Sequence, residues 1–117
     1  YGGTQRLVQY IGKGRALELL MTADMIDANK ALDWGLATHV VPHGEEVDKA
    51  TAILKKIAKK APIAIAKTIA AVNAYFDKEV DGFNQEVLLF AQTVKTEDFK
   101  EGATAFIEKR KADFKGK

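Results

Sequence analysis

TEDFKEGATAFIEKRK, residues 96–111, carries the local features of a complete α-helix, with Lys109, Arg110 and Lys111 crowded at its end. Thr96 is a preferred N-cap residue, and Glu97 and Asp98 place negative charge in the first turn, near the positive end of the helix dipole. Apolar residues then recur at helical spacing, at Phe99, Ala103, Phe106 and Ile107. We therefore expect a short helix with one apolar stripe here.

The same spacing predicts three further helices upstream, over about residues 45–58, 62–76 and 81–93. Pro62 suits the first turn of the second of these helices because a proline lacks only a donor that is unpaired there anyway. Lysines crowd the end of the first helix, at Lys55, Lys56, Lys59 and Lys60. They are either a solvated face that complements the helix dipole or a patch that attracts the phosphates of a nucleotide-bearing ligand.

Shorter helices are expected nearer the N-terminus, over residues 4–11, 15–22 and 28–34. Gly12-Lys13-Gly14 separates the first two and is interpreted as a hinge, because no strand precedes it and no Ser or Thr follows it as in a phosphate loop. Asp27 is expected to cap the third helix.

Gly35 is expected to end that third helix as a C′ residue. The following residues, 36–41, include β-branched side chains and are predicted as a short strand that Pro42 stops. The expected fold is thus mostly α, with about seven helices and one short strand. A single strand cannot form a sheet, so it either pairs outside this chain or is only an extended connection.

The composition limits the classes of function. The 117 residues include 47% hydrophobic and 29% charged side chains, as in one ordinary globular unit. The net charge of +2 gives no argument for nucleic acid, and no apolar run reaches the roughly 20 residues of a membrane span. The absence of Cys and Ser excludes thiolate chemistry, Cys-based zinc sites and serine nucleophiles.

No complete catalytic constellation follows from the residues alone. His39 and His43 lack the spacing of metal ligands and are assigned structural or solvent-exposed roles. The acidic pairs 45–46 and 97–98 sit at predicted helix starts, where capping explains them. Glu86 lies in a predicted helix without an evident apolar pocket that would raise its pKa.

Aromatic residues on adjacent predicted helices indicate a possible ligand surface. Phe90 and Phe106 are the aromatics, and Lys109 follows Phe106 by three residues, which would place both on one helix face. An aromatic floor with a cation at its rim suits a ligand with an apolar tail and phosphates. The alternative is a core with a lysine whose ammonium reaches solvent.

Several stretches in order along the chain resemble the crotonase (enoyl-CoA hydratase/isomerase) family. They are GGTQRL (2–7), ALELLMT (16–22), WGLA (34–37), TEDFKEG (96–102) and EKRK (108–111). The resemblance covers essentially the whole chain and is nearest to the short-chain enoyl-CoA hydratase and 3-hydroxybutyryl-CoA dehydratase branch.

The resemblance implies the C-terminal helical, trimerising portion of a ββα-spiral subunit. Residues 1–42 would be the end of the spiral core, and residues 43–117 the helical region that oligomerises and forms the rim of the coenzyme A site. Because the chain opens at Tyr1 without a Met, we expect a truncated product that lacks the N-terminal half of the same subunit.

The implied function is that of a fragment of an enoyl-CoA hydratase, whose parent adds water reversibly to 2-enoyl-CoA. In such hydratases two glutamates flank the water and two backbone N–H groups hold the thioester oxygen. All four would precede Tyr1, so no catalytic residue is assigned and the fragment alone is expected to be inactive. The alternatives are another activity of the family, such as enoyl-CoA isomerase, or a non-catalytic assembly and binding module.

The resemblance also assigns residues that line the acyl-CoA site. Phe90, Phe106 and Lys109 match positions that often reach a neighbouring subunit's pocket, and Tyr1, Gly2 and Gly3 match the loop near the acyl chain. Tyr1 is bulky for that position, which implies a shorter acyl chain.

The implied partners are an acyl-CoA thioester and further copies of the chain, as a trimer or a dimer of trimers, with no nucleic acid and no membrane. No cofactor is expected, since coenzyme A is part of the substrate. The expected location is the cytoplasm, or alternatively the mitochondrial matrix.

Overall fold

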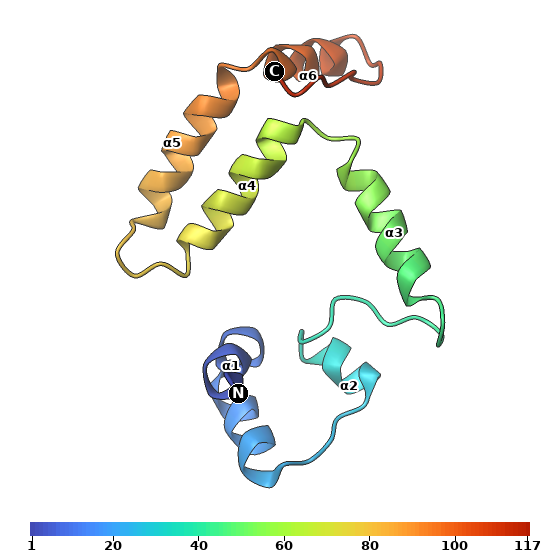
Figure 1. Ribbon diagram of the computed structural model, residues 1–117, viewed down its shortest axis with the longest axis vertical. Coiled ribbons are helices and arrows are strands. Elements are labelled where there is room, and N and C mark those ends of the chain that lie inside the picture. Colours follow the sequence, from blue (N-terminus) through green and yellow to red (C-terminus); the bar gives the residue numbers. More distant parts are fainter. The chain divides into compact units, whose positions relative to one another are not determined.

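The computed structural model describes all residues, 1–117, and its regular secondary structure is entirely α-helical (Figure 1). Its helices are α1 (Gly3–Thr22), α2 (Ala28–Asp33), α3 (Glu46–Ile57), α4 (Pro62–Ala74), α5 (Gly82–Val94) and α6 (Glu97–Ile107). The chain forms two compact units, Tyr1–Lys49 and Ala50–Lys117. None of the helices combines the length and apolar composition needed to cross a bilayer.

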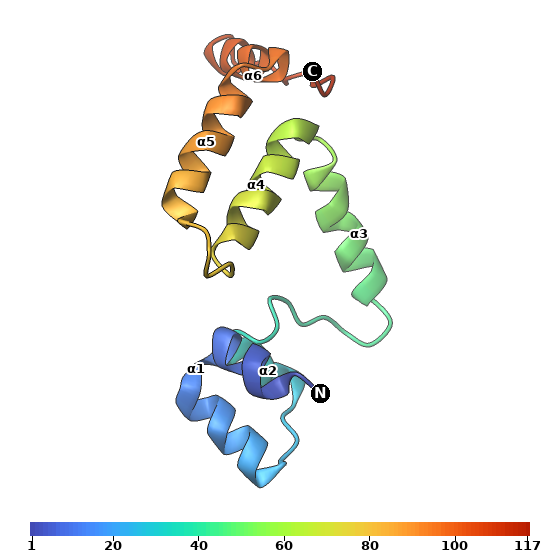
Figure 2. The ribbon, with the colours of Figure 1, turned by 60° about the vertical axis from the view of Figure 1, so that its left-hand side comes forward.

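In the first unit, α1 consists of two helical segments that meet at a sharp kink at Gly12 (Figure 2). Gly12 has φ 79° and ψ 164°, a conformation that only glycine adopts readily. The predicted break between residues 4–11 and 15–22 is therefore confirmed at Gly12. Gly14 continues in helical geometry, so one glycine makes the bend.

The ends of α2 are set by the two residues that the sequence indicated. The Asp27 carboxylate accepts a hydrogen bond from the Lys30 backbone N–H (2.7 Å), which caps the start. At the other end Gly35 takes φ 78°, with its N–H donated to the Leu32 carbonyl (3.0 Å). The Leu36 N–H reaches the Ala31 carbonyl (2.9 Å), which completes a Schellman motif.

Trp34 contributes to the packing of α2 against α1. Arg15, on α1, lies 5.4 Å from the centre of the indole ring, and Lys30, on α2, lies 4.6 Å from it. Both cations interact favourably with the π face of the indole. Ile11 and Ala16, on either side of the bend in α1, are the buried apolar residues of this unit.

The predicted strand over residues 36–41 is wrong. These residues form irregular backbone with bends at Leu36 and Thr38. A strand is defined by hydrogen bonds to a neighbouring strand, and the chain contains no other strand to supply them. The β-branched composition alone could not overcome the missing partner.

The second unit is centred on a hairpin of α4 and α5, which lie side by side in both views (Figures 1 and 2). Pro62 occupies the first turn of α4, as predicted. A Cβ on Gly82, at the start of α5, would lie 3.9 Å from the backbone of Ala74, so the two helix ends meet closely. Lys67 ties the middle of the hairpin by donating a hydrogen bond to the Gln92 side chain (2.5 Å).

Thr96 joins α5 to α6 through a single hydroxyl group. Its Oγ1 donates to the Thr93 carbonyl at the end of α5 (2.8 Å) and accepts from the Phe99 N–H in the first turn of α6 (3.1 Å). The same residue thus closes one helix and caps the next, as its N-cap position in the sequence indicated.

Candidate ligand-binding surface

The apolar stripes of the second unit are largely uncovered. On α5 the large apolar residues Phe83, Val87 and Phe90 are exposed, whereas Leu89 is buried. On α6 the residues Phe106 and Ile107 are exposed too. The buried residues of the unit are Ala74, Leu89, Asp98 and Ala105.

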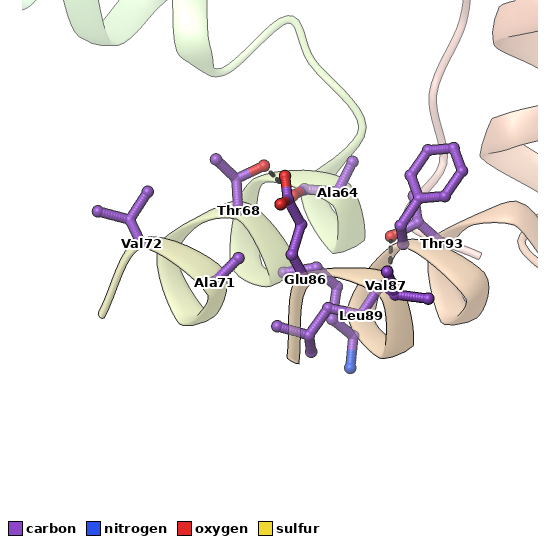
Figure 3. Close-up of a pocket in the computed structure, with 10 residues that line it drawn as sticks. Ala64, Thr68, Ala71, Val72, Glu86, Val87, Leu89 and Thr93 are labelled. Carbon is purple, nitrogen blue, oxygen red and sulfur yellow. Dashed lines mark hydrogen bonds between the residues drawn. The ribbon is translucent and has the colours of Figure 1, made fainter. Parts of the chain in front are cut away.

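An open groove of about 560 Å³ runs between α4 and α5 (Figure 3). Its walls are mostly apolar or small, and its polar groups are Lys67, Thr68, Glu86 and Thr93. The two hydroxyls are already engaged, since Thr68 donates to the Ala64 carbonyl (2.9 Å) and Thr93 to the Leu89 carbonyl (3.0 Å). The groove therefore offers an apolar surface with one free carboxylate, that of Glu86.

Phe90 lines this groove and packs edge-on against Phe99 of α6, with ring centres 6.5 Å apart. It remains 62% exposed, so one face of the ring is available to a ligand or a neighbour. Phe106 does not line the groove and is 86% exposed. The structure thus places both predicted aromatics on the surface but does not join them into one floor.

Lys109 does not share a helix face with Phe106, and that prediction is wrong. Helix α6 ends at Ile107, and Lys109 lies beyond it with φ 53°, in the left-handed region. The three-residue spacing aligns side chains only while the helix continues. The Lys109 ammonium is exposed and forms no hydrogen bond or ion pair with the rest of the chain.

Glu101 and Arg110 form a bidentate ion pair next to Lys109 in the sequence. The Arg110 Nη1 and Nη2 atoms donate to the two Glu101 carboxylate oxygens at 2.6 and 2.8 Å. Arg110 Nε also donates to Glu108 (2.6 Å), and the Asp113 N–H donates to Glu101 (2.8 Å). The Arg110 hydrogen bonds, followed by that from Asp113, lower the pKa of Glu101 from 4.5 to about 2.

Asp98 fastens the end of the chain to α6. Its carboxylate accepts hydrogen bonds from the backbone N–H groups of Lys115 (2.7 Å) and Gly116 (2.8 Å), while its own N–H donates to the Lys117 carbonyl (3.0 Å). Asp98 is only 3% exposed. Gly102, one turn further along α6, lets the Phe114 ring approach to 3.4 Å from the position of a Cβ.

Sequence reasoning missed both carboxylates as anchors of residues 108–117. It explained Asp98 by the helix dipole, and it gave Glu101 no role. The partners are nine to eighteen residues away in the sequence and are reached only because the chain reverses after α6. No local periodicity carries that information.

The remaining predicted site residues, Tyr1, Gly2 and Gly3, belong to the first unit. The Tyr1 ring is fully exposed, and its carbonyl accepts a hydrogen bond from Arg6 Nη2 (2.9 Å). Gly2 has φ 83°, and a Cβ there would lie 2.5 Å from the Arg6 guanidinium. The backbone conformation favours glycine at this position, whereas the flexible Arg6 side chain can move aside.

Comparison with known proteins decides the family. The sequence matches the enoyl-CoA hydratase/isomerase family over residues 1–117. The chain belongs to this family. The family membership and the mainly helical C-terminal fold expected from the sequence are therefore confirmed.

Individual relatives in the enoyl-CoA hydratase/isomerase family agree. The chain is 43% identical over 115 residues to the mitochondrial enoyl-CoA hydratase of Pongo abelii, covering 97% of this chain and 40% of that protein. It is 40% identical over 116 residues to the short-chain-enoyl-CoA hydratase of Clostridium acetobutylicum, covering 97% of this chain and 44% of that protein.

Among solved structures, the enoyl-CoA hydratase of Bacillus anthracis superposes with a TM-score of 0.90 at 39% identity. The match covers 99% of this chain and 45% of that one. The chain thus spans less than half the length of these members of the enoyl-CoA hydratase/isomerase family. None of these comparisons assigns roles to individual residues, so Phe90, Phe106, Lys109, Tyr1, Gly2 and Gly3 stay predicted contacts.

Proposed function

We propose that the complete subunit hydrates 2-enoyl-CoA reversibly to 3-hydroxyacyl-CoA, and that residues 1–117 supply its assembly surfaces and part of its acyl-CoA rim. The observation that carries this proposal is the 40–43% identity, along nearly the whole chain, to relatives named as enoyl-CoA hydratases. One of them is named crotonyl-CoA hydratase, which favours a short acyl chain.

The acid and base that act on the water are placed outside residues 1–117. Within the chain, Asp98 and Glu101 are held by backbone N–H groups and Arg110, so neither carboxylate is free to carry a proton to a ligand. Glu86 is free but stands in an open groove between two helices. An isomerase reaction remains the second candidate, because the matched family includes both chemistries.

The activity is tested with crotonyl-CoA and a 3-enoyl-CoA. We expect the complete subunit to remove the enoyl absorbance of crotonyl-CoA and the isolated 117-residue chain to leave it unchanged. Turnover by the isolated chain would refute the placement of the catalytic groups. Faster conversion of the 3-enoyl-CoA than of crotonyl-CoA would favour the isomerase instead.

The acyl-CoA contact of Phe106 and Lys109 is tested in the complete enzyme. Replacing either by Ala should raise the KM for crotonyl-CoA and leave kcat nearly unchanged, because the contact is made equally in the ground and transition states. Lys111→Ala is the matched control, since it removes an exposed ammonium two residues away. An unchanged KM in both variants would remove these residues from the site.

We further propose that the chain assembles into a trimer or a dimer of trimers and packs against the remainder of its own subunit. The exposed stripes of α5 and α6 support this, because contiguous apolar surface in a folded protein marks an interface. Light scattering of the complete protein should give the mass of a trimer or of a dimer of trimers. The mass of a monomer would contradict this proposal.

No cofactor, nucleic acid or membrane enters this proposal, since coenzyme A arrives as part of the substrate. The proposed location is the cytoplasm, with the mitochondrial matrix as the alternative, which one relative's name supports. Cell fractionation with an antibody to the chain would decide between the two.

A further inference from the structure

Lys109 occupies a backbone position that another helix of this chain gives to glycine. Its N–H donates to the Phe106 carbonyl (3.3 Å), and the Arg110 N–H donates to the Ala105 carbonyl (3.0 Å). These bonds form the same Schellman motif that ends α2, where the left-handed residue is Gly35. A lysine is disfavoured in the left-handed region, and such conformations persist only where the surroundings impose them.

Bonds on both sides of Lys109 impose this conformation. Arg110 is joined through its side chain to Glu108 and to Glu101, and it also donates to the Lys111 carbonyl (3.2 Å). The residues before and after Lys109 are thus linked to each other and to α6. The turn at Lys109 follows from these fixed ends.

The same network keeps the Lys109 ammonium free. Arg110 engages the carboxylates of both Glu101 and Glu108, and Lys109 pairs with neither of them. With its low pKa, Glu101 stays ionised and paired with Arg110 at neutral pH. Lys109 consequently carries an uncompensated, exposed positive charge on a fixed backbone.

We propose that Glu101 and Arg110 are positioning residues for Lys109: they hold its backbone so that its free ammonium is presented to a phosphate of the coenzyme A moiety. This inference rests on the proposed function, because it requires that Lys109 contact acyl-CoA. It goes further in assigning a role to residues that do not themselves touch the ligand. A lysine on a fixed backbone has less conformational freedom to lose on binding than one on a mobile segment.

A double-variant experiment on the complete enzyme tests this with crotonyl-CoA. Lys109→Ala and Glu101→Gln are each expected to raise KM by about threefold to fivefold, the range of a partly exposed ion pair, with kcat unchanged. The combined variant should show the KM of Lys109→Ala alone, because Glu101 acts through Lys109. Glu97→Gln, an exposed change of the same kind on α6, is the matched control and should leave KM unchanged.

A second substrate separates positioning from general damage to the fold. Crotonyl-pantetheine presents the same acyl thioester without the nucleotide phosphates. Glu101→Gln should leave its KM unchanged if Glu101 acts only through the lysine–phosphate pair. A Glu101→Gln defect that is equal for both substrates would reveal a merely structural role and overturn the inference.

The outcomes also distinguish the inference from the proposal on which it rests. If Lys109→Ala raises KM but Glu101→Gln does not, the lysine contact stands and the positioning role falls. If Lys109→Ala leaves KM unchanged, both the Lys109 contact with acyl-CoA and the positioning role of Glu101 and Arg110 are rejected. Independent, multiplying effects in the combined variant would likewise overturn the positioning role.

Discussion

At the scale of single residues, the left-handed conformation of Lys109 is a local cost that substitution can relieve. Glycine adopts φ 53° without a Cβ clash, whereas alanine carries the same clash as lysine. Lys109→Gly should therefore be more stable than Lys109→Ala by about 1 kcal/mol. Thermal or urea unfolding of the two variants measures the difference, and equal stabilities would mean that this turn relaxes once the lysine is removed.

Glu101 makes the folded state sensitive to acid. Its pKa is about 2 in the fold and 4.5 when unperturbed, so unfolding takes up a proton between those values. The ion pair with Arg110 thus contributes its full stability above pH 4.5, and this contribution falls as the pH drops toward 2. The stability difference between the wild type and Glu101→Gln should shrink across that window.

Measurement of unfolding midpoints for both proteins at several pH values from 6 down to 2 would check this. Glu97→Gln serves as the control, because the Glu97 carboxylate makes no hydrogen bond in the fold. A constant difference between wild type and Glu101→Gln at all these pH values would contradict the depressed pKa.

At the scale of helices, Thr96 holds α5 and α6 together with one hydroxyl. Thr96→Ala removes both the donated bond to Thr93 and the accepted bond from Phe99, and should cost about 1 kcal/mol, as is usual for a lost N-cap. Thr96→Ser keeps the hydroxyl and should lower the free energy of unfolding much less. Urea unfolding of the three proteins tests this, and equal losses in both variants would assign the effect to the methyl group instead.

The boundaries of helices could be predicted because their causes are local. Asp27, Pro62 and Thr96 act on backbone groups within a few residues, and the structure places each where the sequence indicated. The buried faces could not be predicted in this way. Helical spacing finds an apolar stripe, but it does not tell whether this chain or another surface covers the stripe.

The predicted site shows the same limit. The predicted shared face of Phe106 and Lys109 assumed that α6 continues, whereas the Glu101–Arg110 pair forms because it stops. A helix that ends with lysine in the C′ position gives no glycine signal to mark the stop. The strand over residues 36–41 failed for a related reason, since its formation requires a partner that local composition cannot supply.

At the scale of the whole molecule, the two units leave much of their large apolar surface uncovered, which sets a test of the assembly proposal. Val87, on the exposed stripe of α5, is 66% accessible in the chain by itself. If this stripe is buried in the complete protein, Val87→Glu would force an unpaired charge into an apolar interface. The free energy of unfolding would then fall by about 3 to 5 kcal/mol, or the oligomer would dissociate.

If the stripe instead faces solvent, Val87→Glu should change the stability by about 0.5 kcal/mol or less, as surface substitutions do. Gln92→Glu is the matched control, because it adds the same charge on α5 at a site where Lys67 can pair with it. Unfolding midpoints and light-scattering masses of the complete protein distinguish the cases. A Val87→Glu protein as stable and as large as Gln92→Glu would show that nothing covers the exposed stripe at Val87, and would remove the main support for an interface on this helix.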